Sequence, residues 1–205
     1  MNEIAVIDYG MGNLHSMAKA LETVADGHRV RIVDTPEAIE RADRLVFPGV
    51  GAMSACMQAL RERGLLEAIR QAANDRPFLG VCLGMQALFE HSEEGGASQG
   101  LGLLKGRVRR FEAEAELKIP HMGWNRVCAT AEHPVLSGLN EAWFYFVHSY
   151  YCEPAEPSAI AGECRYGRNF CAAVSQDKLF AVQFHPEKSQ GDGLRLLRNF
   201  VHWRP

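Results

Sequence analysis

The sequence predicts a three-layer α/β fold, in which a central, mainly parallel sheet with an antiparallel extension carries helices on both faces. Up to about residue 90, short runs rich in Val, Ile and Phe alternate with segments of helical periodicity. This alternation is typical of βαβ units and of a parallel sheet that is covered on both sides. After about residue 100 the pattern changes to short strand-like pieces separated by Gly, Pro and Asn, which indicates hairpins or an antiparallel extension of the same sheet.

The first half of the chain supplies four expected strands, each followed by an expected helix. The strands are continuous apolar runs, as buried parallel strands are, and the helices carry apolar residues at helical spacing. Sheets of this kind bind ligands at the carboxyl ends of their strands. In chain order the expected elements are strand 3–8, helix 12–25, strand 29–34, helix 36–42, strand 44–47, helix 52–74, strand 77–81 and helix 83–90.

The second half supplies shorter strands and a closing helix. The final segment, 192–203, has apolar residues on one helical face, at Leu194, Leu197, Phe200 and Val201. No internal repeat or linker interrupts the chain, so we expect a single domain over residues 1–205. The expected strands of this half are 107–111, 143–151, 160–164, 170–175 and 179–183.

Composition excludes several classes of function. The 205 residues include 22 Lys and Arg against 25 Asp and Glu, a net charge of −3, and 47% are hydrophobic, as in a globular protein with a full core. Nucleic-acid binding rests on neutralised phosphates and is disfavoured by this balance. The uncharged stretch 77–89 is shorter than the roughly 18 apolar residues of a membrane span, and the N-terminus lacks a signal-peptide pattern. We therefore expect a cytoplasmic protein.

Neither a metal nor a cofactor is expected. The six cysteines form no Cys-x-x-Cys pair and no zinc-finger spacing with His, so we expect most of them to be small buried thiols. Residues 8–13 (DYGMGN) are similar to a dinucleotide-binding turn, but position 15 is His where that turn has its third glycine. The sequence therefore argues against a nicotinamide or flavin cofactor.

Cys82 differs from the other cysteines in its neighbours. Segment 77–90 (PFLGVCLGMQALFE) has the pattern of a buried strand, then Gly80-x-Cys82-x-Gly84, then a helix. The two glycines permit the tight strand-to-helix turn that exposes a nucleophile at the top of a sheet. The N-terminus of the following helix favours a thiolate and offers N–H groups to an oxyanion. We therefore predict that Cys82 is a catalytic nucleophile.

A base for this thiol is present in Phe184-His185-Pro186-Glu187, which follows the expected strand 179–183. A thiol nucleophile needs a base, and the base needs a group that orients it. Pro186 favours an extended backbone at His185, and residues two apart in extended chain project to the same side, so Glu187 can hold the imidazole. Alone, the motif would more simply be a loop histidine beside an unrelated carboxylate. With Cys82 it predicts a Cys-His-Glu triad.

A glycine-rich turn at 48–51 (PGVG) directly follows the expected strand 44–47. Paired glycines allow a backbone N–H of Gly49 or Val50 to turn toward a developing oxyanion, although most such turns are only turns. Together with the N–H of Leu83, this turn predicts an oxyanion hole.

These motifs resemble those of a known family, the class I or triad glutamine amidotransferases, which hydrolyse the side-chain amide of glutamine. The Cys82 turn and the His185-Pro-Glu187 motif are shared across that class. Further blocks, spread over nearly the whole chain, are similar to the glutaminase subunits of imidazole glycerol phosphate synthases. The predicted fold is then of the flavodoxin-like type. These blocks are 8–14 (DYGMGNL), 48–51 (PGVG), 120–125 (PHMGWN), 146–149 (FVHS) and 184–189 (FHPEKS).

The resemblance implies roles for further residues. Gln86 and Glu94 would bind the amino-acid end of glutamine, together with backbone groups of Gly51, Ser149 and Tyr150. The positions that match the subunit interface and the ammonia exit of the family are His121, Met122, Trp124, Tyr145 and Lys188.

The resemblance also implies a partner, a (β/α)8-barrel cyclase subunit that forms a heterodimer with the glutaminase and receives its ammonia through a protected channel. The cyclase would make imidazole glycerol phosphate for histidine biosynthesis and an aminoimidazole carboxamide ribonucleotide. Because discarded ammonia wastes glutamine, we expect activity to depend on the loaded partner, with the 48–51 peptide reorienting to complete the oxyanion hole.

Two alternatives remain open. The first is the glutaminase subunit of another triad amidotransferase, such as that of anthranilate synthase, which the 120–125 block disfavours. The second is a non-catalytic, flavodoxin-like binding module. Such a module has no need for Cys82, His185 and Glu187 together.

Overall fold

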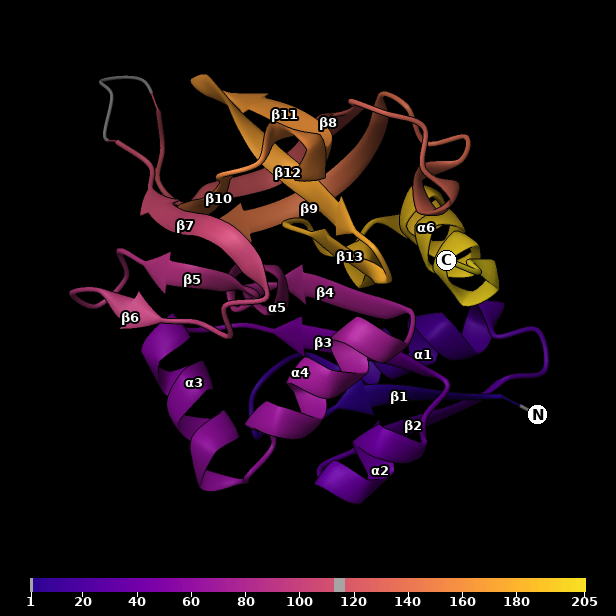
Figure 1. Ribbon diagram of the computed structural model, residues 1–205. Coiled ribbons are helices and arrows are strands. Elements are labelled where there is room, and N and C mark those ends of the chain that lie inside the picture. The colour runs from indigo at the N-terminus through magenta and orange to yellow at the C-terminus, as the bar shows by residue number, and fades with distance from the viewer. Residues whose placement is uncertain (1, 113–116) are drawn as a thin grey trace.

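The computed structural model describes residues 2–112 and 117–205, which form a sheet with helices on both faces (Figure 1). The five neighbouring strands β2, β1, β3, β4 and β13, in that spatial order, run parallel. The carboxyl ends of β3, β4 and β13 therefore meet at one edge of the sheet. The bounds of these strands are β1 (Glu3–Ile7), β2 (Arg29–Val33), β3 (Arg44–Gly49), β4 (Phe78–Cys82) and β13 (Leu179–Val182).

Beyond β13 the sheet continues mainly in antiparallel strands. β12 pairs with β13, β10 with β12 and β7 with β10, after which β5 runs parallel to β7 and β6 forms the edge. An antiparallel branch leaves β12 through β11 and β8 to β9, at the top of Figure 1. The predicted antiparallel extension is confirmed. Its strands are β5 (Phe89–Ser92), β6 (Ser98–Gln99), β7 (Leu104–Arg110), β8 (His121–Ala129), β9 (Ala142–His148), β10 (Tyr150–Pro154), β11 (Ile160–Tyr166) and β12 (Arg168–Gln176).

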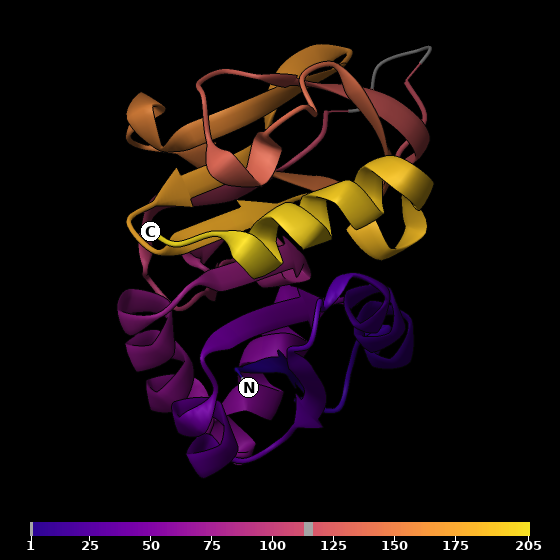
Figure 2. The same cartoon turned by 90° about the vertical axis from the view of Figure 1, so that its right-hand side faces the viewer.

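Helices cover the two faces in separate layers (Figure 2). Alternate side chains of β1 point to opposite sides, so that Val6 joins the core beneath α1 and α6 while Ile7 joins the core beneath α2, α3 and α4. The predicted three layers are confirmed. The helices are α1 (Leu14–Val24), α2 (Pro36–Arg41), α3 (Met53–Glu62), α4 (Leu66–Asp75), α5 (Leu83–Gln86) and α6 (Gln190–His202), with short 3-10 turns at Pro134–Leu136, Pro157–Ala159 and Pro186–Lys188.

Three predicted elements differ from the structure. The expected helix 52–74 is two helices, α3 and α4, because the chain turns at Gly64, whose φ of +67° ends a helix. The expected helix 83–90 is the single turn α5, after which the chain enters β5 and pairs with the distant strand β7. A short apolar run fits helix or strand equally well, so the distant partner decides. The expected strand 143–151 is interrupted at Ser149, between β9 and β10.

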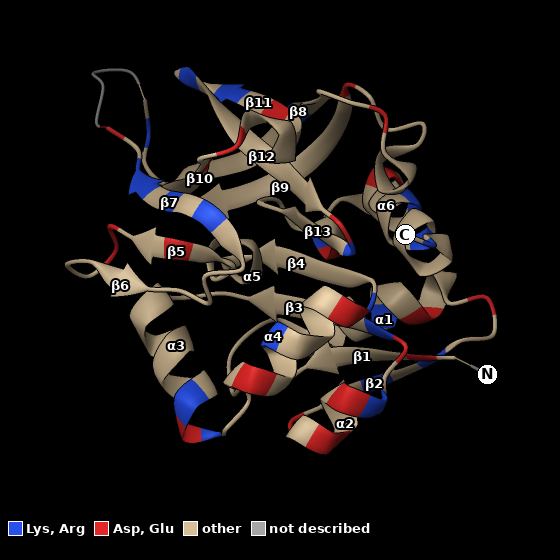
Figure 3. Cartoon of the chain, in the orientation of Figure 1, with Lys and Arg blue, Asp and Glu red and all other residues tan. Residues whose placement is uncertain are grey.

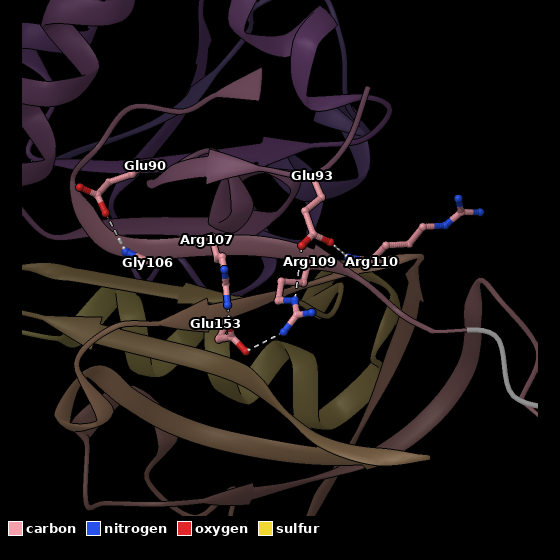
Figure 4. Close-up of polar contacts among 7 residues, drawn as sticks. All are labelled: Glu90, Glu93, Gly106, Arg107, Arg109, Arg110 and Glu153. Atoms are coloured by element: carbon pink, nitrogen blue, oxygen red, sulfur yellow. Dashed lines mark hydrogen bonds and ion pairs between the residues drawn. The ribbon is translucent and has the colours of Figure 1, made fainter. Parts of the chain in front are cut away.

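Charged residues lie on the helices, in the loops and on several strands, whereas β4 and β9 carry none (Figure 3). A cluster of ion pairs joins β7, β10 and the end of β5 (Figure 4). Arg109 contacts both Glu153 and Glu93 at 3.4 Å, and Glu93 also accepts a hydrogen bond from the backbone N–H of Arg110 at 3.0 Å. These contacts fix the start of the loop between β5 and β6.

Within residues 2–112 and 117–205, no helix is long and apolar enough to cross a membrane. The same residues contain no group of three His, Cys, Asp or Glu side chains that could hold a metal ion.

Candidate active site

Cys82 ends β4 and precedes α5 with a backbone φ of +55° and ψ of −111°. Residues other than glycine rarely adopt this φ, and the strain that it stores is typical of functional sites. The turn requires Gly84, because a methyl group there would collide with the backbone carbonyl of Phe47 on β3. Cys82 therefore lies on the strand-to-helix turn that the sequence predicts, at the carboxyl edge of the sheet.

His185 follows β13 and reaches the same edge, because β13 and β4 are parallel neighbours. Its Nδ1 lies 2.9 Å from Oε1 of Glu187, and both side chains are only 2% exposed. An ionised carboxylate only accepts, so Nδ1 is the donor in this pair. The other ring nitrogen, Nε2, is buried and has no hydrogen-bond partner among the described residues. His185 and Cys82 line one cavity.

The protonation of His185 is set by its two neighbours. Burial by itself lowers the pKa of this imidazole, but the hydrogen bond with Glu187 and the charges of Cys82 and Glu187 outweigh burial and raise the pKa to about 10. The ring is then protonated at neutral pH. Elsewhere burial raises the pKa of the Cys56 thiol to about 12 and that of Cys164 to about 12, which keeps both thiols neutral.

The cavity has a volume of about 420 Å³. Gly49 lies outside its lining as the register partner of Cys82 on β3, and Glu187 lies outside it as the hydrogen-bond partner of His185. Every other residue that the sequence analysis assigned to the oxyanion hole or to the substrate lines the cavity. These residues are Val50, Gly51, Leu83, Gln86, Glu94, Ser149 and Tyr150.

The segment after β3 lies beside the nucleophile. A side chain at Gly49 would come within 2.6 Å of the Tyr9 hydroxyl and 2.9 Å of Cβ of Leu83, so only glycine fits there. Gly51 has a φ of +97°, and the Val50 side chain between the two glycines is 38% exposed. Because both flanking residues are glycines, the peptides of this segment have the conformational freedom that a reorienting oxyanion donor needs.

Gln86 and Glu94 are each held by hydrogen bonds to other elements of the chain. Nε2 of Gln86 donates to the Tyr150 carbonyl at 3.2 Å and to Oε1 of Gln183 at 3.0 Å, which leaves Oε1 of Gln86 to accept from a ligand. Oε2 of Glu94 accepts from the backbone N–H of Met53 at 2.6 Å, at the start of α3. The pocket therefore offers an amide oxygen and a carboxylate to a polar ligand.

The model of the glutamine amidotransferase class-I family matches residues 5–203 of the chain. The chain belongs to this family. Among curated members, the imidazole glycerol phosphate synthase subunit HisH of Methylococcus capsulatus is 55% identical, with 100% of this chain and 98% of that protein aligned. The subunit of the same name from Acinetobacter baylyi is 52% identical, with 99% of each aligned.

Solved structures agree on the fold. A crystal structure of a glutamine amidotransferase matches with a TM-score of 0.74 at 22% identity, over 97% of this chain and 96% of that one. The PurLQS structure from Thermotoga maritima matches with a TM-score of 0.71 at 16% identity, over 98% and 97% of the two chains. Within the class I glutamine amidotransferases, the chain therefore groups with the curated HisH subunits, which align with it over essentially their whole length. Neither alternative from the sequence analysis is supported.

Two polar residues of this amidotransferase site were missed by sequence reasoning. Gln183 is fully buried, and its Nε2 lies 3.7 Å from Sγ of Cys82. Its one sequence signal is that it is the polar residue at the end of the apolar run 179–182. His148, to which the sequence analysis assigned no role, lines the cavity together with His185.

The residues expected at the subunit interface divide between the two faces of the β8–β9 hairpin. Met122 is 61% exposed and Trp124 44% exposed, and Trp124 pairs across the hairpin with Tyr145. Nζ of Lys188 lies 5.9 Å from the centroid of the Tyr145 ring. His121 is different, because it is 3% exposed on the opposite face of β8. Strand alternation turns His121 inward, and its expected place at the interface or ammonia exit stays a prediction.

Proposed function

We propose that this glutamine amidotransferase hydrolyses glutamine with Cys82 as nucleophile, His185 as base and acid, and Glu187 as the group that orients His185. The observation that carries the proposal is the strained turn at Cys82, beside a buried His185–Glu187 pair in the same cavity. Strain and a raised histidine pKa together are typical of catalytic sites rather than of structural ones.

In this mechanism the Cys82 thiolate attacks the side-chain amide carbon of glutamine. The resulting oxyanion accepts hydrogen bonds from the N–H of Leu83 and from an N–H of the Gly49–Val50 segment, each donor lowering the barrier by on the order of 3 kcal/mol. Protonated His185 donates its Nε2 proton to the leaving nitrogen, the C–N bond breaks, and ammonia departs. His185 then takes a proton from water, the hydroxide attacks the thioester, and glutamate leaves with Cys82 restored as thiolate.

The polar groups on the other side of the cavity would hold the amino-acid end of the substrate. In our proposal the Glu94 carboxylate pairs with the α-ammonium group, and Oε1 of Gln86 accepts from it or from a neighbouring donor. Backbone groups of Gly51, Ser149 and Tyr150 complete the contact. These donors and acceptors lie on the lining of one cavity with Cys82, which supports a single bound glutamine.

We further propose that the exposed face of the β8–β9 hairpin docks a (β/α)8-barrel cyclase subunit, which receives the ammonia through a protected channel. Met122, Trp124 and Trp143 are exposed together on this face, with Trp143 53% exposed. Exposed aromatic and Met side chains are enriched at protein interfaces. Tyr145 pairs with Trp124 across the hairpin, its carbonyl accepts from the N–H of His185 at 2.9 Å, and its ring lies 5.9 Å from Nζ of Lys188. The proposal also includes one domain over residues 1–205 and a cytoplasmic location.

The proposal is tested by two measurements on the purified chain. Glutamate release from glutamine is measured alone and with the cyclase subunit carrying its ribonucleotide, and strong release only with the loaded partner is expected. Equal release without any partner contradicts the coupled mechanism.

Iodoacetamide labelling at pH 7 should modify Cys82 before Cys128, the exposed thiol, and a glutamine analogue should suppress the labelling of Cys82. Preferential labelling of Cys128 would exclude a thiolate at Cys82.

A further inference from the structure

His121 and His148 form a buried pair next to the cavity, which His148 lines. The hydrogen-bond partners of the two rings show which ring nitrogens carry protons. Nδ1 of His148 lies 2.7 Å from the Tyr150 carbonyl, which only accepts, so this nitrogen carries a proton. Nε2 of His148 lies 2.9 Å from Nδ1 of His121. Because both rings are neutral, Nε2 of His148 accepts and Nδ1 of His121 donates.

The far end of this pair is held by Asn125 on β8. Its Nδ2 lies 3.2 Å from Nε2 of His121 and 3.0 Å from the Arg165 carbonyl, while its Oδ1 accepts from the N–H of Arg126 at 2.8 Å. The Arg165 carbonyl, which only accepts, and the Arg126 N–H, which only donates, fix which end of the Asn125 amide is nitrogen. The hydrogen bonds therefore run in one direction, from Asn125 through His121 and His148 to the carbonyl of residue 150.

The surroundings keep this chain of hydrogen bonds rigid. His121 stacks on Tyr166 with ring centroids 4.0 Å apart and on Phe146 at 4.7 Å. Burial lowers the pKa of His121 to about 4, and burial together with the charges of His121 and His185 lowers the pKa of His148 to about 3. Protonation of either ring would set two donors against each other, so the neutral pair keeps its direction at pH 7.

The chain ends on a residue of the glutamine pocket. The Tyr150 carbonyl that accepts from His148 also accepts from Nε2 of Gln86, at 3.2 Å. A carbonyl has two lone pairs, and these two donors use both. A shift of the carbonyl would therefore change the orientation of the Gln86 amide, including its Oε1.

We propose that Asn125 and His121 are positioning residues for glutamine, which act through His148 and the Tyr150 carbonyl to orient Gln86. The inference rests on the proposed function in one respect, the role of Gln86 in substrate binding. Asn125 lies on β8, whose opposite face carries Met122 and Trp124. The proposed docking face and the glutamine pocket are thus connected through one strand and three side chains.

The test is the substitution Asn125→Asp, which replaces the donor to His121 with an acceptor. His121 must then present a proton at Nε2, either as imidazolium or by inverting both tautomers, and either change disturbs the Tyr150 carbonyl. We expect the KM for glutamine of the partner-loaded enzyme to rise about 10-fold with kcat within about 2-fold, the loss of one hydrogen-bond contact. Nitrogen-15 NMR of labelled histidine should show the changed protonation at His121.

Asn199→Asp is the matched control, because Nδ2 of Asn199 also makes two hydrogen bonds, to the carbonyls of Val135 and Ser137, and none of these three residues lines the cavity. Asn125→Ala is a second variant. It leaves Nε2 of His121 without its Asn125 donor but does not reverse the His121 tautomer, so the KM of this variant should rise less than that of Asn125→Asp. Thermal unfolding of each variant verifies that it is folded.

Four outcomes test the inference and separate it from the function on which it rests. A raised KM in Asn125→Asp with a normal KM in Asn199→Asp supports the inference. A normal KM in folded Asn125→Asp, while Gln86→Ala raises KM, overturns it and leaves the proposed function intact. A normal KM in Gln86→Ala overturns the substrate role of Gln86 and with it this inference. An unprotonated Nδ1 at His148 in the unmodified protein overturns it as well.

Discussion

His185 and His148 line the same cavity, and both are at most 5% exposed, but their pKa values are shifted in opposite directions. The pKa of His185 is raised to about 10, whereas that of His148 is lowered to about 3. Burial favours the neutral ring in both cases. The partners differ: His185 contacts the Glu187 carboxylate and faces a thiol that can ionise, whereas His148 contacts a backbone carbonyl and a second neutral imidazole. The state of a buried histidine is thus decided by the charge of its partner and not by its depth.

The largest expected effect comes from removing the negative partner with Cys82→Ala. Without the nucleophile, we expect glutamate release by the partner-loaded enzyme to fall by at least about 10⁴-fold. The pKa of His185, followed by NMR, should fall because one of its two charged neighbours is gone. Cys171→Ala is the control, since this buried thiol lies on β12 outside the cavity lining. Residual turnover close to that of the control would disprove the role of Cys82.

A smaller loss is expected for Glu187→Gln, which keeps an oxygen that accepts from Nδ1 of His185 but removes the charge. We expect kcat to fall by about 10²- to 10⁴-fold, the range for a triad whose orienting carboxylate is neutralised. The pKa of His185 should drop below about 10, because Glu187 is one cause of its rise. Glu132→Gln serves as control for an exposed carboxylate. If the His185 pKa does not move, the charge of Glu187 is not what distinguishes the two histidines.

The smallest expected effect is on the pH dependence of the free energy of unfolding, to which His121 and His148 contribute with one sign and His185 with the other. The folded pKa values of His121 and His148 are about 4 and about 3. When the pH is below the ordinary histidine pKa, these two side chains therefore bind more protons in the unfolded chain than in the folded chain. The free energy of unfolding should therefore decrease as pH falls below about 6.5, by up to about 1.4 kcal/mol per pH unit for each ring. For His185 the sign is opposite: its contribution is complete below about 6.5 and is lost as pH rises through about 10.

Urea unfolding across this pH range measures both slopes. His121→Gln should flatten the acid slope by about one proton, whatever it does to stability at pH 7. An acid slope that is unchanged in His121→Gln would mean that His121 is not held neutral in the folded protein.

Local patterns suffice for the part of the fold that holds the triad. Cys82 and the 48–51 turn could be placed because each directly follows a continuous apolar strand of the parallel sheet, where position along the chain determines position in space. The pairing of β5 with β7 could not be predicted, since the run at Phe89 satisfies helix and strand alike until its distant partner is known.

The role of His121 shows the same limit inside the site. The segment 121–129 contains Gly123, Asn125 and Arg126 and was not predicted as a strand. Once it is known to be β8, period-two alternation separates His121 from Met122 without further information. Gln183 carried too little signal, because one polar residue at the end of an apolar run is common and its approach to Cys82 depends on the register of β13 with β4.

Cys82 is the one residue of β4 with a strained, positive-φ backbone. A side chain at its φ of +55° costs of order 1–3 kcal/mol that glycine would not incur. A laboratory selection for thermostability alone would therefore favour Cys82→Gly, which would give a protein with a higher melting temperature and no nucleophile. Stability engineering of this chain has to be screened on glutamate release as well as on melting temperature.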